Sequence, residues 1–244
     1  MITQQLLLAG GTHLGNDSFT KILLHMDGTN GSTTFTDSNL GGSANTWTAT
    51  GDAQITTVAS KFGGAAGQFS NNTNSCIRTN DSASFTLGAG EFTVDFWFNT
   101  NGAGNGTDRL MWGQGNSTAN GGFTAYGALT TANVIYGAVS TNGTAEAARI
   151  TSTSTFTAAG WHHYAFVRTV NTLKLFIDGT QQGGDVAYSG TMTDSANKFG
   201  IATIGEYGAS VGSLLYPGYI DEFRLSVGIA RWTSNFTPST IAYF

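Results

Sequence analysis

The residues in this sequence most able to perform catalysis are its 15 Asp and Glu side chains. Glycoside hydrolysis needs two carboxylates flanking the scissile bond, about 5–5.5 Å apart in retaining enzymes. On a strand, that spacing comes from carboxylates at alternate positions, because alternate side chains share a face. Glu91 and Asp95 have Thr93 between them, where a carboxylate would be needed. Asp221 and Glu222 are adjacent and face opposite sides. The hydrolase pattern is absent, and we expect no enzyme activity.

A histidine pair and a lone cysteine are the other candidate reactive groups. His162 and His163 are adjacent, so on a strand they point to opposite faces and cannot hold one metal ion together. We interpret one as packed inward with a hydrogen bond and the other as outward. Cys76 has no second cysteine near it and is expected to act as a small buried apolar residue.

Aromatic side chains give the sequence a second kind of chemistry, the binding of saccharides. An aromatic ring can stack on the face of a sugar while Asn, Asp or Arg side chains bind its hydroxyls. Trp97, Trp112, Tyr126 and Tyr136 are placed where they could lie on an outward sheet face, so they are the candidate glycan-binding residues. Most aromatic residues of an all-β chain lie in the core or in cross-strand pairs, and that alternative stays open for each of the four.

The composition excludes several other classes of protein. Charged residues make up 10% of the chain, against roughly 25% in typical soluble domains. A net charge of -5 with 10 Lys and Arg residues argues against nucleic-acid binding, which requires clustered cations. No stretch approaches the ~20 apolar residues of a membrane span, so membrane insertion is not expected. The N-terminus lacks the basic region and apolar core of a signal peptide, which predicts assembly in a cytoplasm.

The hydrophobic pattern predicts an all-β fold. In residues 91–98, Phe92, Val94, Phe96 and Phe98 share one face of a strand, and other segments alternate in the same way. Further strands are predicted at Lys21–Met26, Gln54–Val58, Ala66–Ser70, Asp108–Gly113, Gly122–Gly127, Val134–Val139, Ala147–Thr151, Trp161–Arg168, Leu173–Ile177, Phe199–Gly205 and Tyr219–Val227. Many short strands with Gly-rich turns indicate a sandwich or barrel. We expect a weakly apolar N-terminal arm over residues 1–20 and one domain over 21–244.

Several motifs, in this order, resemble laminin-G-like, concanavalin A-like domains. They are Leu23-Leu24-His25-Met26-Asp27-Gly28, Lys61-Phe62-Gly63-Gly64-Ala65-Ala66-Gly67-Gln68-Phe69, Phe92–Phe98, Trp161–Arg168 with Leu173–Gly179, and Gly218-Tyr219-Ile220-Asp221-Glu222-Phe223-Arg224-Leu225. The resemblance covers about residues 21–235 and implies two stacked antiparallel sheets of a jelly roll. It also implies a structural Ca²⁺ held by Asp27 and Asp221 with backbone carbonyls, although either carboxylate can instead serve only local hydrogen bonds.

The segment Gly228-Ile229-Ala230-Arg231-Trp232-Thr233-Ser234-Asn235-Phe236-Thr237-Pro238 looks like the version of this domain in tailed-phage structural proteins. That resemblance implies a non-enzymatic virion protein (capsid decoration, head fibre or tail fibre) that docks on capsid or tail proteins through its N-terminal arm. Self-association into a symmetric homo-oligomer is the default expectation. The alternative is a carbohydrate-binding module for polysaccharide on the host surface.

Overall fold

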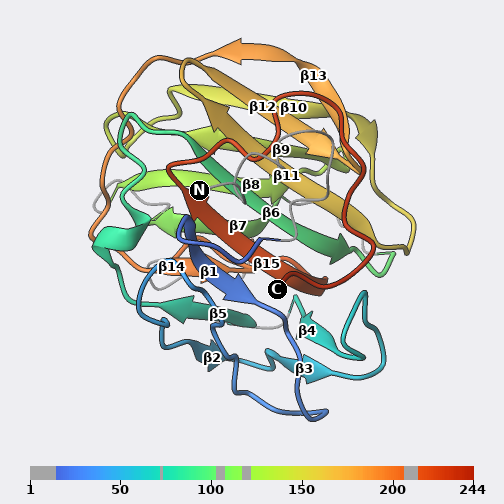
Figure 1. Ribbon diagram of the computed structural model, residues 1–244. Coiled ribbons are helices and arrows are strands. Elements are labelled where there is room, and N and C mark those ends of the chain that lie inside the picture. Colours follow the sequence, from blue (N-terminus) through green and yellow to red (C-terminus); the bar gives the residue numbers. More distant parts are fainter. Residues whose placement is uncertain (1–14, 72–73, 103–107, 117–121, 206–213) are drawn as a thin grey trace, which may run out of the picture.

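The computed structural model describes residues 15–71, 74–102, 108–116, 122–205 and 214–244, and these form two stacked antiparallel sheets (Figure 1). Sheet A has the order β13 (Thr180–Ala187), β12 (Thr172–Ile177), β11 (His162–Thr169), β6 (Phe92–Asn99), β15 (Gly218–Val227), β4 (Ala66–Phe69) and β3 (Gln54–Thr56), with β1 (Thr20–Leu24) also on β15. Sheet B has the order β10 (Ala148–Thr155), β9 (Val134–Val139), β8 (Phe123–Leu129), β7 (Arg109–Gly115), β14 (Phe199–Ile201), β5 (Cys76–Thr79) and β2 (Thr48–Thr50). The predicted two-sheet jelly-roll sandwich is confirmed.

Helix is almost absent from this architecture. The described residues contain one 3-10 turn, η1 (Ala83–Phe85), and the Ser82 side chain caps it by accepting a hydrogen bond from the Ser84 backbone N–H. In the ranges given above, no helix has the length and apolar character required to cross a membrane.

The core lies between the sheets, where the alternating side chains of both layers meet. Phe92, Val94, Phe96 and Phe98 of β6 all point inward and are fully buried. The ring of Phe96 stacks on Tyr164 of β11 at 4.7 Å and on Phe223 of β15 at 5.3 Å between centroids. Cross-strand aromatic pairs of this kind add to the stabilisation from apolar burial, so β6 anchors the centre of sheet A.

Three strands were not predicted from the sequence. β2 and β5 have only three and four residues, too few to show an alternation. β13 is a polar edge strand with two glycines and a break in its register against β12. It is joined to β12 through Asp178 and Gly179, whose φ angles of 51° and 73° form the predicted tight turn.

The outer face of sheet A is covered by the chain itself, which the alternation did not predict. Residues 228–244 cross this face, and Figure 1 shows the red C-terminal segment passing in front of the sheet. Trp232 and Phe236 of this segment stack at 4.1 Å. A Cβ at Gly179 would come within 1.9 Å of the Phe236 carbonyl oxygen, so glycine at the β12–β13 turn permits the close approach of the tail.

A buried ion pair lies under this covering segment. Arg224 donates to both carboxylate oxygens of Asp95, from Nε at 3.0 Å and from an amino group at 2.9 Å. The Tyr243 hydroxyl donates to Asp95 at 2.6 Å and lies 3.1 Å from Nε2 of His163. All four side chains are buried. Burial alone would raise the pKa of Asp95, but Arg224 and His163 outweigh it and hold that pKa well below its usual range.

The described part of the N-terminal region joins the same layer. Arg231 bonds to Asp17 at 2.9 Å, and the Asn16 backbone N–H donates to the Phe244 carbonyl at 3.1 Å. Thr20, which we placed in the arm, already belongs to β1. Residues 1–14 of the predicted arm lie outside the described residues, so the arm stays a prediction.

We predict that Asp95→Ala is strongly destabilising, because it leaves the Arg224 guanidinium buried without its partner. The expected loss in the free energy of unfolding, measured by urea denaturation, is about 3–5 kcal/mol. Asp185→Ala is the matched control, since it removes the carboxylate of an exposed pair with Lys174 and should cost less than about 1 kcal/mol. Equal effects of the two substitutions would contradict this account of the ion pair.

Candidate functional site

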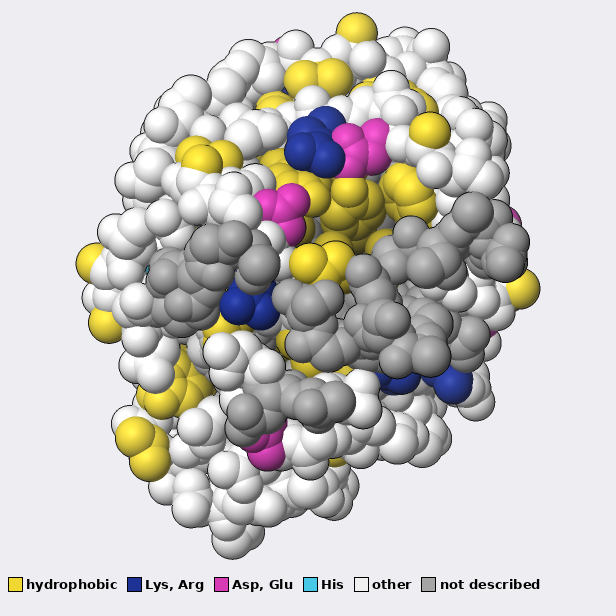
Figure 2. Space-filling model, turned by 180° about the vertical axis from the view of Figure 1, so that it is seen from behind, with side chains coloured by type: hydrophobic (Ala, Val, Ile, Leu, Met, Phe, Trp, Pro, Cys, Tyr) yellow, Lys and Arg dark blue, Asp and Glu magenta, His cyan; other side chains and the backbone are white. Residues whose placement is uncertain are grey.

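The outer face of sheet B carries a cluster of apolar side chains in its centre, most of them buried. Its residues come from the outward positions of β7, β8 and β9 and from the segments that follow β14. They are Leu110, Phe123, Ala128, Tyr136, Ala138 and Ile204, with Tyr126 and Leu214 packed against them. Figure 2 shows hydrophobic side chains gathered in the middle of this face, with acidic and basic side chains at the border. We call this set the sheet B face.

Small residues keep the floor of the sheet B face close to the backbone. Ala128 and Ala138 point outward, and Gly113 on β7 lies beneath Tyr126. A Cβ at Gly113 would approach the Tyr126 Cβ to 2.7 Å, so a larger residue there would displace the tyrosine. Because these positions carry Gly or Ala, three aromatic rings can pack directly against the backbone of the strands.

These three rings form a connected row. Tyr126 lies 5.2 Å from Phe123 and 5.6 Å from Tyr136 between ring centroids, each pair edge-to-face. The Tyr136 hydroxyl donates to the Tyr126 hydroxyl at 3.5 Å, and the Tyr126 hydroxyl donates to Glu146. Tyr126 is half-buried, whereas Phe123 and Tyr136 are buried beside it, so Tyr126 is the ring of this row with surface open to a ligand.

An ion pair completes the sheet B face. Arg149 of β10 lies 4.0 Å above the centroid of the Tyr136 ring, and its Nε donates to Glu146 at 2.7 Å. Burial alone would raise the pKa of Glu146, but hydrogen bonds from Arg149 and Tyr126 outweigh it and lower that pKa. Both side chains are therefore charged at neutral pH and held in fixed orientations, ready to accept and donate hydrogen bonds.

The structure brings together two of the four candidate glycan-binding residues. Tyr126 and Tyr136 are adjacent on the sheet B face. Trp112, in contrast, points into the core, is 1% exposed and stacks on Phe199. Trp97 lies on the outer face of the other sheet, beneath the Lys61 ammonium at 3.8 Å. The expectation of an outward Trp112 is wrong, because the register shift between Leu110 and Trp112 on β7 turns its side chain inward.

Sequence reasoning missed Arg149 and Glu146 as members of this site. Catalysis by carboxylates requires a pair of acidic residues, and Glu146 has no second acidic residue near it in the sequence. The signal for Arg149 was present, because the alternation of Ala148, Arg149 and Ile150 puts the arginine on the outward side of its strand. Its position opposite Ala138 depends on strand register, which the sequence does not give.

The two predicted metal ligands, Asp27 and Asp221, lie near each other at one end of sheet A. Asp221 is fully buried, and its Oδ2 accepts hydrogen bonds from the backbone N–H groups of Lys61 and Phe62 at 2.8 and 3.1 Å. The Asp27 carboxylate lies against Gly63 in the same loop, where a Cβ would come within 2.0 Å of its Oδ1. Only glycine allows this approach.

The donor set at this loop fits a calcium ion better than a transition metal. It offers the carboxylate oxygens of Asp27 and Asp221, which are hard ligands of the kind that Ca²⁺ prefers, and backbone N–H groups of Lys61, Phe62 and Glu222 donate to Asp221 there. No Lys or Arg side chain forms an ion pair with Asp221 within the part of the chain that the structure describes. Within that same part, no three His, Cys, Asp or Glu side chains converge on one point, so an ion here would need backbone carbonyl or water oxygens as well.

A sequence profile described as the concanavalin A-like lectin/glucanases superfamily matches residues 69–228, more than half of the chain. The chain belongs to this superfamily. No curated protein matches the chain in sequence. Solved binding domains of toxins have a similar fold.

Three such structures illustrate the likeness. The binding domain of Paraclostridial Mosquitocidal Protein 1 superposes with a TM-score of 0.62 at 14% identity, over 89% of this chain and 51% of that one. The Botulinum Neurotoxin serotype G binding domain gives 0.61 at 12%, over 86% and 48%. The Botulinum Neurotoxin DC binding domain in complex with SialylT gives 0.60 at 12%, over 89% and 49%. The chain spans about half the length of these domains, and identities this low show the fold alone.

The buried Asp221 carboxyl gives a testable dependence of stability on pH. Burial, followed by the negative charges of Glu222 and Asp27, raises the pKa of Asp221 to about 8. Between the ordinary value of 3.8 and about 8, the folded chain holds a proton that the unfolded chain has released. The free energy of unfolding therefore falls as pH rises through this window.

We predict this fall in urea unfolding between about pH 5 and about pH 8, with chelator present. Asp221→Asn removes the titration and should flatten the curve. His25, whose pKa is raised by its hydrogen bond to Glu222, keeps a smaller slope of the same sign in both proteins. Parallel pH curves for the wild type and Asp221→Asn would refute the assignment.

Proposed function

We propose that this chain is a non-catalytic carbohydrate-binding module and that the sheet B face holds the saccharide. The observation that carries the proposal is the half-buried Tyr126 ring, supported from behind by the buried Phe123 and Tyr136 rings, beside the fixed Arg149–Glu146 pair. Aromatic rings with a few fixed polar groups are the usual composition of small-molecule sites. The complex of a similar binding domain with SialylT adds support from the fold.

The charge state of the site argues for binding rather than hydrolysis. A general acid works best when its pKa lies near the working pH, whereas hydrogen bonds from Arg149 and Tyr126 lower the pKa of Glu146. Asp95, the acid singled out on β6, is held by Arg224 beneath the C-terminal segment on the other sheet. Neither carboxylate is placed to protonate a leaving group, so we propose that the module is not an enzyme.

We predict that Tyr126→Ala and Arg149→Ala each weaken saccharide binding about tenfold or more, since each removes a fixed contact at the centre of the site. An array of neutral and acidic glycans identifies the binding sugars, and calorimetric titration measures the loss. Lys174→Ala is the matched control, because it removes a surface cation and its ion pair on the other sheet. Unchanged affinity in both test variants would contradict the assignment of the sheet B face.

We also propose a setting for the module, namely display on the virion of a tailed phage, docked on capsid or tail proteins after assembly in the host cytoplasm. The support comes from the sequence: residues 228–238 resemble phage structural proteins, and the charge-poor surface suits close packing of identical copies. In this setting the sheet B face would contact polysaccharide on the host surface. Head decoration, head fibre and tail fibre are equally compatible with these features.

The virion setting predicts that the domain is present in purified phage particles. Cryo-electron microscopy should show density of its size at regular positions on the head or the tail, arranged with the symmetry of a homo-oligomer. Particles that assemble fully in the absence of the protein and never contain it would overturn the setting, while leaving the saccharide site to be judged by titration.

We further propose that Asp27 and Asp221 hold a structural Ca²⁺ together with carbonyl oxygens of the loop at residues 61–64. The ion would neutralise two neighbouring carboxylates and tie the end of β1 to β15 and to this loop. Support comes from the two carboxylates that lie near each other at this loop and from the lack of a cationic partner for Asp221 in the described residues.

The calcium proposal predicts that millimolar Ca²⁺ raises the melting temperature and that a chelator reverses the change. The increase should be larger near pH 8 than near pH 5, because the ion competes with the proton on Asp221. Asp27→Ala should abolish the response, whereas Asp185→Ala, an exposed acid elsewhere, should keep it. A wild-type melting temperature that stays the same when Ca²⁺ is added would exclude the site.

A further inference from the structure

A second candidate surface lies on sheet A, at the end of its outer face. Here Tyr219 of β15 pairs with Asn99 of β6 on one side and with Gln68 of β4 on the other, and Gln68 pairs with Gln54 of β3. Because these residues are opposite one another in register, their side chains form one outward row across four strands. Trp161 extends the row, since its ring lies 6.5 Å from that of Tyr219.

The row has one ring that is partly exposed, Trp161, and a rigid support for it. Trp161 is half-buried, and Tyr219, at 8% exposed, packs behind it. The loop that carries Trp161 is fixed to the end of β6, because the Gly160 N–H donates to Oδ1 of Asn99 at 3.1 Å and the Thr100 hydroxyl donates to the Ala158 carbonyl at 3.2 Å. The tryptophan is thus held in place before any ligand arrives.

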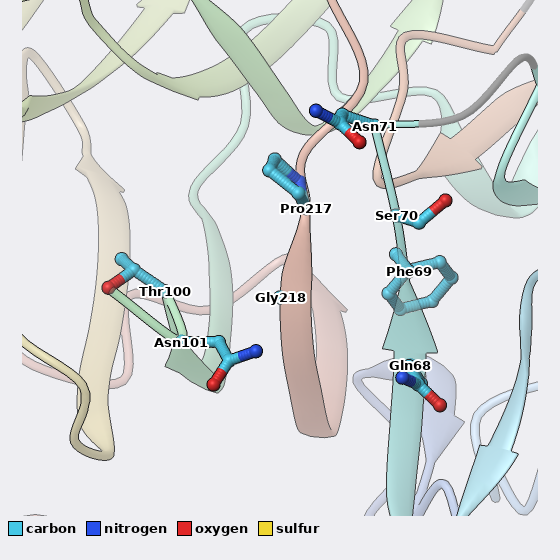
Figure 3. Close-up of a pocket in the computed structure, with 8 residues that line it drawn as sticks. All are labelled: Gln68, Phe69, Ser70, Asn71, Thr100, Asn101, Pro217 and Gly218. Atoms are coloured by element: carbon cyan, nitrogen blue, oxygen red, sulfur yellow. The ribbon is translucent and has the colours of Figure 1, made fainter. Parts of the chain in front are cut away.

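A cavity of about 260 Å³ opens beside this row. Figure 3 shows its walls: Thr100 and Asn101 from the end of β6 on one side, Gln68 and the residues after β4 on the other, and Pro217 with Gly218 at the start of β15 between them. Its volume suits one sugar unit. In the described part of the chain, no charged side chain lines it.

Hydrogen-bonding groups around the cavity are left with spare capacity. Gln68 accepts from Gln54 through Oε1 at 3.2 Å, which leaves the amide N–H groups of Gln68 unused among the described residues. The Asn101 side chain is exposed and engages none of those residues. The fully buried Tyr216 hydroxyl also has no partner there, and it lies next to Gly218, where a Cβ would come within 2.8 Å of it.

We propose that this surface is a second saccharide-binding site, in which Trp161 stacks on a neutral sugar unit and the amides of Gln68 and Asn101 bind its hydroxyls. The uncharged lining favours a neutral sugar over an acidic one, since no cation in the cavity offsets the desolvation of a carboxylate. The site lies on the opposite sheet from Tyr126 and Arg149. It extends the proposed function but does not depend on it.

Two sites on opposite sheets have a physical consequence. One chain can hold two segments of the same polysaccharide, or two separate chains, so that the second contact forms at a high effective concentration. Binding to a long polymer should therefore be tighter than binding to its short fragments, even if each site alone is weak.

The test is calorimetric titration with four neutral hexasaccharides, maltohexaose, cellohexaose, laminarihexaose and mannohexaose, and with hexagalacturonic acid as the acidic comparison. We expect Trp161→Ala to weaken binding of at least one neutral hexasaccharide about tenfold or more, and Asn101→Ala to weaken the same one. Phe19→Ala, which removes an exposed ring outside the row, is the matched control and should leave the affinity unchanged.

The outcomes separate the two sites. Loss of binding in Trp161→Ala and Asn101→Ala but not in Tyr126→Ala supports the second site alone, and loss in all three supports both. Three outcomes overturn the second site. They are a loss of binding in Tyr126→Ala alone, tighter binding of hexagalacturonic acid than of the neutral hexasaccharides, and no binding of any neutral hexasaccharide. Asn101 is exposed but has a φ of 51°, which alanine adopts poorly and glycine adopts freely, so Asn101→Gly is measured beside Asn101→Ala and decides the matter if Trp161→Ala unfolds.

Discussion

The Asp95–Arg224 ion pair is the interaction on which the rest of this structure depends. Both side chains project from the outer face of sheet A, where in most sandwiches they would meet water, yet both are fully buried. A charge pair out of water is tolerated only when its remaining hydrogen bonds are satisfied. The Tyr243 hydroxyl donates to Asp95 and the Gly15 carbonyl accepts from Arg224, which requires the C-terminal residues and the described N-terminal residues to lie over this face of sheet A.

This covering layer decides which surfaces remain for a ligand. With the centre of sheet A occupied by its own chain, the sheet B face and the row that ends at Trp161 are the surfaces that combine aromatic rings with fixed polar groups. On the sheet B face, the small residues Gly113, Ala128 and Ala138 leave room for the Tyr126 and Tyr136 rings, of which Tyr126 is half-buried and Tyr136 is buried behind it. The Arg149–Glu146 pair then adds charge that is already oriented before a ligand binds. Both surfaces therefore meet the requirement of a preformed site.

The sequence predicts which side chains lie between the two sheets, but it does not predict which segments and side chains cover the outer faces. Alternation on β6 assigns Phe92, Val94, Phe96 and Phe98 to the core, because period-2 patterns report burial directly. The same pattern placed Asp95 and Trp97 on an outer face but could not show that a distant tail covers it, since that contact joins residues more than 130 positions apart. Trp112 was misplaced because a register shift on β7 reverses the alternation locally. Arg149 was missed because its neighbours depend on strand pairing.

Hydroxyl-radical footprinting of the free protein measures directly which aromatic side chains are accessible to solvent and which are covered. The account predicts oxidation of Trp161 and Tyr126 and protection of Tyr243 and Trp112, because Tyr243 is the tail residue that packs against Asp95 and Trp112 lies in the core. Oxidation of Tyr243 at a rate equal to that of Trp161 would show that the C-terminal segment does not cover sheet A. That result would contradict the central claim.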